Sequence, residues 1–222
     1  MEMVRVDTQR VYEVLWDKIT TLELAPGTHL NEQELAEELD MAVTSVREAL
    51  RLLAHEDLVK ITPRHGIYVA DVNLPDLQQI SEIRISLEAL SARLAAQRAS
   101  EDDLVVLDSL RHEHATVDRE DTRRLFDVDH KFHQAIAEAA GNKYLADTLE
   151  RYFGLSLRLW YMVLPQLGSL FGNVKEHLEL VDAIRTGDAD QAEQMMHDHV
   201  SEFYARVRKI LEQQAAESNE DA

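Results

Sequence analysis

The sequence predicts a mainly α-helical protein, in which an N-terminal winged helix-turn-helix is followed by a C-terminal all-α helical bundle. Three observations indicate this fold class. Glycine and proline are scarce, with 7 and 4 residues in 222, which favours long helices. Apolar residues recur three and four positions apart along most of the chain, as on the buried face of a helix. One short region, "LVKITPRHGIYVA", is instead rich in β-forming residues around a turn.

The composition excludes several classes of protein. No apolar run approaches the roughly 20 residues that a membrane span needs, and the N-terminus lacks a secretory signal pattern, so we expect a cytoplasmic protein with no membrane partner. Cysteine is absent, which excludes disulfides and thiolate metal sites. The formal net charge of −19 disfavours unspecific binding to polyanions. Any nucleic-acid contact must therefore use a local basic surface.

Residues 1–72 are expected to form the winged helix-turn-helix domain. Three short amphipathic segments are separated by turns, and Asn31 with Glu34 makes a capping-box pattern at the second. The third should be capped by Thr44 or Ser45. The expected elements are helices over Thr8–Leu22, over Glu32–Leu39 and from the cap to about His55, and strands over Val59–Thr62 and Ile67–Ala70.

Residues 76–214 are expected to form a helical domain that binds metal and effector. The segment "DVNLPDL" is the expected linker before it. Breaks between helices are expected at Gly141–Asn142, at 165–172 and at Gly187, where glycine suits a helix C-cap. The expected helices lie near 76–99, 102–117, 122–140, 143–163, 173–186 and 189–214.

Candidate DNA contacts cluster on the third helix and the hairpin of the first domain. Hydroxyls suit phosphates, and arginine suits phosphates or guanine edges. Residues 41–66 hold four Lys or Arg against three Asp or Glu, whereas residues 1–72 hold 7 against 14, so this surface is the least acidic part of its domain. The alternative is that these side chains are ordinary solvated groups. The candidates are Thr44, Ser45, Arg47, Arg51, Arg64 and His65.

The first domain resembles the N-terminal domain of the GntR family of bacterial transcription regulators. The resemblance rests on the Pro-Gly turn before Leu30, on "ELAEEL", on "VREALRLLAHEDLV" and on "HGIYV". It implies that Thr44, Arg47 and the wing pair His65–Gly66 contact DNA. The family usually has Ser-Arg-Thr-Pro before the recognition helix, where this chain has Ala-Val-Thr-Ser at residues 42–45.

The stretch "RLFDVDHKFHQAIAEAAGN" carries two polar side chains beside its apolar stripe. Asp129 and His133 are four residues apart, so on a helix they point the same way. Burying either group costs several kcal/mol unless it is paired or bound to a metal. His177 and His199 also lie at helical spacing from apolar residues. Four such groups from three helices suit a metal site in a bundle core, although a single inward histidine is more often a hydrogen-bonded core residue.

The second domain resembles the FCD effector domain of the FadR subgroup of that family. The resemblance rests on "EIRISLEALSARLAA", "DVDHKFHQAIAEAAGNKYL", "KEHLELVDAIRTGDADQA" and "MMHDHV". It implies that a divalent cation such as Zn²⁺ or Ni²⁺ is bound, with a small organic acid completing its coordination. The ligands that it implies are Asp129, His133, His177 and His199.

The chemistry of this ligand set is consistent with a divalent metal and an anionic effector. Three imidazoles and one carboxylate suit zinc, nickel, cobalt, manganese or iron. The ion keeps a positive charge after Asp129 binds, so a small carboxylate could fill an open position. Arg84 is the candidate for a second carboxylate, unless it forms a salt bridge with Glu88 four residues on. Arg158, within an apolar helix, is a further candidate for effector binding.

A metabolite-responsive DNA-binding transcriptional regulator, expected to be a repressor, is therefore the favoured function, with a divalent metal and a small organic acid effector bound by the helical domain. One reading helix covers a half-site, so we expect a homodimer on a palindromic double-stranded operator. A metal-dependent enzyme or a metal sensor using the same site is the alternative. An enzyme is disfavoured because no general base is evident beside the site and a winged helix has little use in a hydrolase. An architectural DNA-binding protein is disfavoured by the acidity of the chain.

Overall fold

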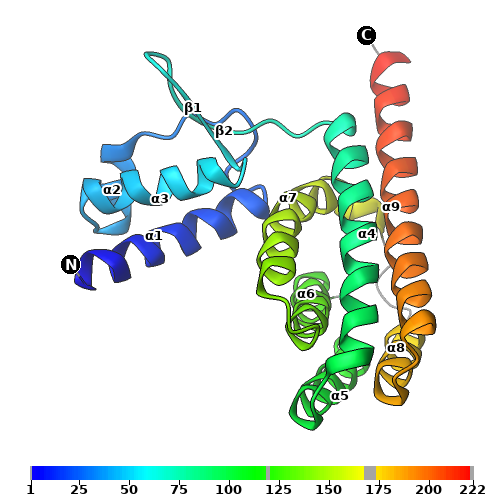
Figure 1. The fold of residues 1–222 in the computed structure, drawn as a ribbon. Coiled ribbons are helices and arrows are strands. Elements are labelled where there is room, and N and C mark those ends of the chain that lie inside the picture. Colours follow the sequence, from blue (N-terminus) through cyan, green and yellow to red (C-terminus); the bar gives the residue numbers. More distant parts are fainter. Residues whose placement is uncertain (1, 119–120, 168–173, 221–222) are drawn as a thin grey trace. The chain divides into compact units, whose positions relative to one another are not determined.

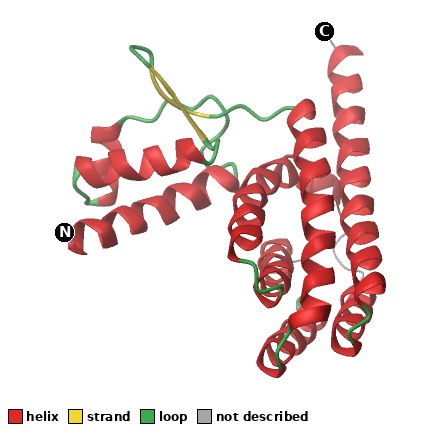
Figure 2. Ribbon diagram, in the orientation of Figure 1, coloured by secondary structure: helices red, strands yellow, loops and turns green. Residues whose placement is uncertain are grey.

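The protein is mainly helical, as expected, with one two-stranded antiparallel sheet (Figures 1 and 2). Its structure is a computed structural model that describes residues 2–118, 121–167 and 174–220. None of the helices in these ranges is long and apolar enough to cross a membrane. The elements are α1 Glu2–Thr20, α2 Glu32–Leu39, α3 Val43–His55, β1 Val59–Thr62, β2 Gly66–Val69, α4 Leu74–Arg98, α5 Glu101–Thr116, α6 Thr122–Ala139, α7 Lys143–Leu167, α8 Val174–Thr186 and α9 Ala189–Glu220.

The chain divides into two compact units. The first comprises Met1–Asn73 and the stretch Gly154–Met162 of α7, and the second comprises Leu74–Phe153 and Val163–Ala222. Helices α1, α2 and α3, with β1 and β2, therefore belong to one unit. All of α4, α5, α6, α8 and α9 belongs to the other.

The first unit has the predicted winged helix-turn-helix plan. Apolar side chains of α1 and α3, such as Leu15 and Leu50, are fully buried in one core. The hairpin pairs Val59 with Val69 and Thr62 with Gly66. The Asn31 side chain accepts from the backbone N–H groups of Gln33 and Glu34, which confirms the predicted cap of α2.

The predicted cap of α3 is wrong. The helix begins at Val43, and Ala42 occupies the N-cap with no side-chain cap. Ser45 is instead one turn before Ala49, so its side chain points into the core and is 1% exposed. Its hydroxyl has no hydrogen-bond partner within the described part of the chain. The sequence pattern of a capping box was present, but the chain enters the helix two to three residues earlier.

The second unit is a bundle in which α4 and α9 run antiparallel, side by side (Figure 1). Helix α6 packs against α4 and α5, and α8 packs against α4, α5 and α9. Gly141 and Gly187 have φ of +63° and +74°, which confirms the expected helix ends there. The break expected at residues 165–172 lies partly outside the described residues, and α9 extends past its expected end to Glu220, as helix-forming residues allow.

Candidate functional site

Four potential metal ligands from three helices converge inside the second unit. Asp129 and His133 come from α6, His177 from α8 and His199 from α9, and one ligand atom of each lies within 4.8 Å of all the others. Nε2 of His177 is 3.4 Å from Nε2 of His199 and 3.5 Å from Oδ1 of Asp129. Nε2 of His133 is 3.9 Å from Oδ2 of Asp129. The structure thus brings together all four residues that the sequence analysis selected.

The local sequence explains why these polar groups point inward. Val128, Phe132 and Ile136 of α6 are fully buried, so the adjoining positions of Asp129 and His133 lie at the edge of the buried face. The Phe132 ring stacks on the His177 imidazole, with centroids 4.2 Å apart. This contact restrains the plane of the His177 ring.

The pKa values of the buried histidines His177 and His133 are shifted in opposite directions. Burial, and then the imidazoles of His199, His133 and His114, hold the pKa of His177 well below its usual value. His177 is therefore neutral near pH 7 and has a lone pair for a metal. Burial also lowers the pKa of His133, but the attraction and hydrogen bond of the Glu88 carboxylate outweigh it, and the net shift is upward.

Each of the three histidines uses its other ring nitrogen for a partner outside the ligand cluster. Nδ1 of His133 is 3.0 Å from Glu88, and Nδ1 of His199 is 2.8 Å from Glu176. Nδ1 of His177 is 3.0 Å from Nδ1 of His114 on α5. Such outer partners set the tautomer and the ring orientation of metal-binding histidines. In all three rings Nε2 is the nitrogen left facing the cluster.

The donor set fits a divalent metal. Ligands bound at roughly 2.1 Å to a tetrahedral ion lie about 3.4 Å apart, close to the separations of 3.4 and 3.5 Å at His177. Imidazoles and one carboxylate suit borderline transition metals.

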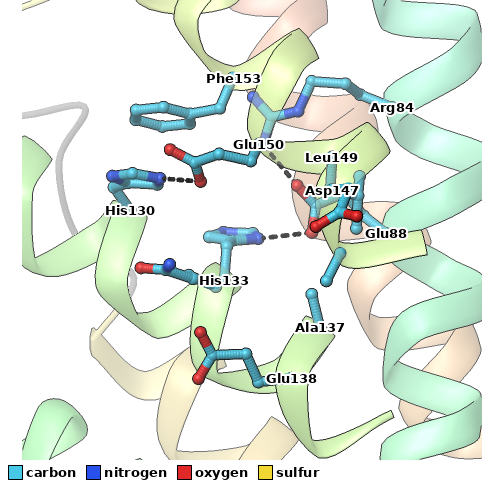
Figure 3. A pocket seen from close by; sticks show the side chains of 12 residues that line it. Arg84, Glu88, His130, His133, Ala137, Glu138, Asp147, Leu149, Glu150 and Phe153 are labelled. Carbon is cyan, nitrogen blue, oxygen red and sulfur yellow. Dashed lines mark hydrogen bonds and ion pairs between the residues drawn. The ribbon is translucent and has the colours of Figure 1, made fainter. Parts of the chain in front are cut away.

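Arg84 forms a buried salt bridge with Glu88, which was the alternative to effector binding. The two side chains are 3% and 2% exposed, and the guanidinium also donates to the Tyr204 hydroxyl at 3.4 Å. Figure 3 shows Glu88 between Arg84 and His133, beside a hollow of about 140 Å³. Carboxylates of Glu138, Asp147 and Glu150 also line this hollow.

A second hollow, of about 200 Å³, lies beside two members of the cluster. It is lined by His177 and His199 and by four carboxylates. Those carboxylates are Glu176, Glu179, Asp198 and Glu202. Carboxylates outnumber the basic groups in the lining of both hollows, which attracts cations and repels free anions.

Arg158 belongs to the first unit. It is 1% exposed and donates to the backbone carbonyl of Ala70, which belongs to the same unit. Burial with a backbone partner explains why an arginine interrupts an apolar helix. Effector binding by Arg158 stays a prediction.

The candidate DNA contacts are mostly exposed, but the arginines of α3 have carboxylate partners. Nε and Nη2 of Arg47 donate to Glu32 at 2.9 and 2.8 Å, and Arg51 donates to Glu48. Arg64 and His65 are exposed in the three-residue loop of the hairpin. Ser45 differs from the others because its side chain is buried. The exposed members are Thr44, Arg47, Arg51, Arg64 and His65.

The sequence analysis missed His114, Glu88 and Glu176 as partners of the cluster. His114 is buried, at 4% exposed, although it was not among the candidate ligands. The signal was present, because Leu104, Leu107 and His114 share one helical stripe and all are buried. The sequence gives no comparable signal for Glu88 and Glu176. Each lies on a helix with other carboxylates, and the spacing does not show which carboxylate faces the cluster.

Comparison with known proteins identifies the family. The model of the bacterial regulatory proteins of the gntR family matches residues 7–69, and the FCD domain model matches residues 79–202. The chain belongs to the GntR family and carries an FCD domain. It is thus a DNA-binding transcriptional regulator, as the resemblance implied, and its relatives are regulators rather than enzymes.

Several curated relatives of this GntR regulator are similar over nearly their whole length. The transcriptional repressor RspR of Escherichia coli is 29% identical over 92% of this chain and 90% of its own. A regulator in an unstable DNA locus of Streptomyces ambofaciens is 30% identical over 93% of this chain and 87% of its own. The galactonate operon transcriptional repressor of E. coli is 27% identical over 91% of this chain and 97% of its own.

Solved structures share the fold. E. coli McbR superimposes with a TM-score of 0.81 at 23% identity, covering 91% of this chain and 97% of McbR. The metal-free FCD domain of TM0439 gives a TM-score of 0.51 at 20% identity, covering 65% of this chain and 99% of that domain.

Proposed function

We propose that this GntR regulator is a metal-dependent, metabolite-responsive repressor of the FadR subgroup that acts in the cytoplasm. One divalent ion, Zn²⁺ or Ni²⁺, is held by Asp129, His133, His177 and His199. The observation that carries this proposal is the convergence of three Nε2 atoms and one carboxylate, each imidazole backed by a partner at Nδ1. The metal, when bound, supplies a Lewis acid that can accept an anionic ligand.

The effector is a small organic acid whose carboxylate binds beside Asp129. Both hollows next to the cluster are lined by protein carboxylates, so an acid has little electrostatic reason to enter before a metal is bound. Arg84 is the protein cation beside His133, and a second carboxylate of the acid would share its guanidinium with Glu88. We therefore expect metal to bind first and the acid second.

Effector binding is coupled to DNA binding through α4. This helix begins at Leu74, shortly after β2 ends at Val69, and carries Arg84 and Glu88. A ligand that changes the contacts among Arg84, Glu88 and His133 would therefore shift α4, the helix that follows the winged domain in the chain. The operator is a palindrome bound by a homodimer, because each chain presents one recognition helix, α3.

Metal analysis tests the first part of the proposal. Full-length protein purified without an affinity tag or chelator should contain about one Zn²⁺ or Ni²⁺ per chain, and His133→Ala should lose it. The matched control is His130→Ala, since His130 lies on the same helix but pairs with Glu150. A wild-type protein that takes up neither metal at micromolar concentration would be incompatible with the proposal.

Light scattering and footprinting test the assembly. A dimer that protects two half-sites related by two-fold symmetry is expected. A monomer on an asymmetric site would contradict the homodimer. If metal alone, with no acid, changes operator affinity, the protein is a metal sensor and the acid is not its effector.

A further inference from the structure

His114 is a buried imidazole that lies outside the cluster of three histidines and one aspartate. It lies on α5, is 4% exposed, and its ring centroid is 4.8 Å from that of His177. Its Nδ1 is 3.0 Å from Nδ1 of His177. Its Nε2 is buried and has no hydrogen-bond partner within the described ranges of the chain. A buried ring nitrogen without a hydrogen-bond partner lowers the stability of the fold, so its burial calls for an explanation, such as a functional role for the ring.

The contact between the two Nδ1 atoms determines where each proton must be. A hydrogen bond between two ring nitrogens needs one proton between them. A metal on Nε2 of His177 requires the lone pair there, so the proton of His177 must sit on Nδ1. His114 must then accept with the lone pair of its own Nδ1, and its proton must be on Nε2. A protonated His114 has no lone pair and could not accept.

The surroundings of His114 favour this neutral acceptor. His114 is 4% exposed and its ring packs against that of His177, and a neutral ring is less costly to bury there than a charged one. The other two histidine ligands, His133 and His199, have carboxylate partners at Nδ1, namely Glu88 and Glu176. A carboxylate in place of His114 would add a further negative charge beside Asp129 at a fully buried position.

We propose that His114 is a positioning residue of the metal site, a neutral acceptor that fixes His177 as the Nδ1–H tautomer and so presents Nε2 to the ion. This inference rests on the proposed metal binding and assigns a role to a residue outside the ligand set. His114 does not touch the metal and acts through His177. Its role parallels that of Glu88 toward His133, without the charge.

The zinc affinities of two variants test whether His114 acts as a hydrogen-bond acceptor or only fills space in the core. His114→Asn keeps a carbonyl oxygen near the position of Nδ1, whereas His114→Leu fills the space without an acceptor. Competition against a chromophoric chelator on the full chain should show zinc binding weakened roughly 10- to 100-fold in His114→Leu, and within about threefold of wild type in His114→Asn. His112→Leu is the matched control, because His112 is exposed on the same helix.

Nitrogen NMR of the zinc-loaded wild type reads the tautomers directly. Long-range ¹H–¹⁵N correlations should place the proton of His114 on Nε2 and that of His177 on Nδ1. A proton on Nδ1 of His114, or zinc affinity in His114→Leu equal to wild type, overturns the role of His114 and leaves the metal site intact. Equal losses in His114→Leu and His114→Asn also overturn it, since the acceptor would then not matter. A wild type that binds no zinc overturns the metal site itself.

Discussion

The Glu88 carboxylate joins Arg84 of its own helix to the imidazole of His133. One oxygen accepts from the Arg84 guanidinium, and the other lies 3.0 Å from Nδ1 of His133. All three side chains are buried. Burial raises the pKa of Glu88, but His133 and Arg84 together outweigh it and hold that pKa far below its usual value. Glu88 is therefore a permanent anion that is both the counter-ion of Arg84 and the hydrogen-bond partner of His133, a candidate metal ligand.

Glu88→Gln should weaken both metal binding and folding. A neutral amide supports the Nδ1–H tautomer of His133 less well, so zinc affinity should fall roughly 10- to 100-fold. Arg84 also loses its counter-charge in a buried site, which should lower the free energy of unfolding by about 3–5 kcal/mol. Chelator competition measures the first effect, and urea denaturation in EDTA measures the second.

Glu138→Gln is the control for this experiment, because Glu138 lines the same hollow but is exposed. It should change neither quantity measurably. If Glu88→Gln lowers stability while zinc affinity is unchanged, Glu88 is only the counter-ion of Arg84, and His133 takes its tautomer from elsewhere.

Removing the metal should destabilise the second unit. Binding to the native state alone adds stability of about 4 kcal/mol when free metal is 1,000 times the dissociation constant. EDTA should therefore lower the thermal midpoint of the loaded protein, and added Zn²⁺ should restore it. His177→Phe keeps a ring against Phe132 but should abolish this response. An EDTA-insensitive midpoint in zinc-loaded wild type would refute metal binding by the native bundle.

Much of this architecture follows from one-dimensional periodicity. The repeat of apolar residues predicted the helices, and the same repeat placed Asp129, His133, His177 and His199 at the edges of buried faces. His114 was within reach of that reasoning, since it shares a stripe with Leu104 and Leu107. The contact between Glu88 and His133 was not, because it joins residues 45 positions apart and depends on how α4 packs against α6.

Local patterns failed where tertiary packing decided the outcome. Ser45 and Glu48 have the spacing of a capping box, yet Ser45 faces the core of the first unit. Arg158 was predicted to bind an effector, which stays a prediction; the structure shows its guanidinium donating to the backbone carbonyl of Ala70. The bidentate pair of Arg47 with Glu32 spans two helices, and nothing in either helix alone indicates it.

Glu32 should restrain Arg47 in its contacts with DNA. In the free protein two N–H groups of Arg47 are bound to the Glu32 carboxylate. Arg47→Ala should weaken operator binding roughly 5- to 150-fold if the arginine reads a base. Glu32→Gln removes a negative charge from the DNA-facing surface, so binding to random DNA should tighten more than binding to the operator. Gel-shift titrations at matched salt measure the ratio of the two affinities.

Glu38→Gln is the matched control, since Glu38 lies on the same helix α2 but pairs with Lys18 of α1. It should leave the ratio of operator to random affinity unchanged. If Glu32→Gln weakens binding to both DNAs equally, Glu32 serves to orient Arg47 and does not restrain it. The pair of Arg47 and Glu32 also predicts a loss of stability in acid. Hydrogen bonds from Arg47 are the chief cause that lowers the pKa of Glu32. The pair therefore contributes to stability above about pH 4.3, and this contribution is lost as the pH falls through the lowered pKa of Glu32.

The last prediction concerns the order of metal and effector binding. A panel of small mono-, di- and tricarboxylates should raise the thermal midpoint of the zinc-loaded protein and leave the metal-free protein unchanged, because both hollows beside the cluster are lined by carboxylates. An acid that binds should then weaken operator binding about 5- to 150-fold, the usual range of allosteric coupling.

Arg84→Lys keeps the charge beside Glu88 but loses the planar fork, so it should reduce the effect of dicarboxylates more than that of monocarboxylates. Arg93→Lys is the control on the same helix, since Arg93 pairs at the surface with Asp190 and Glu193. Stabilisation of the metal-free protein by the same acids would show that the ion does not recruit them. Stabilisation of the loaded protein with unchanged operator affinity would separate the metal site from DNA binding, since a ligand shifts an equilibrium only by its differential affinity for the two states.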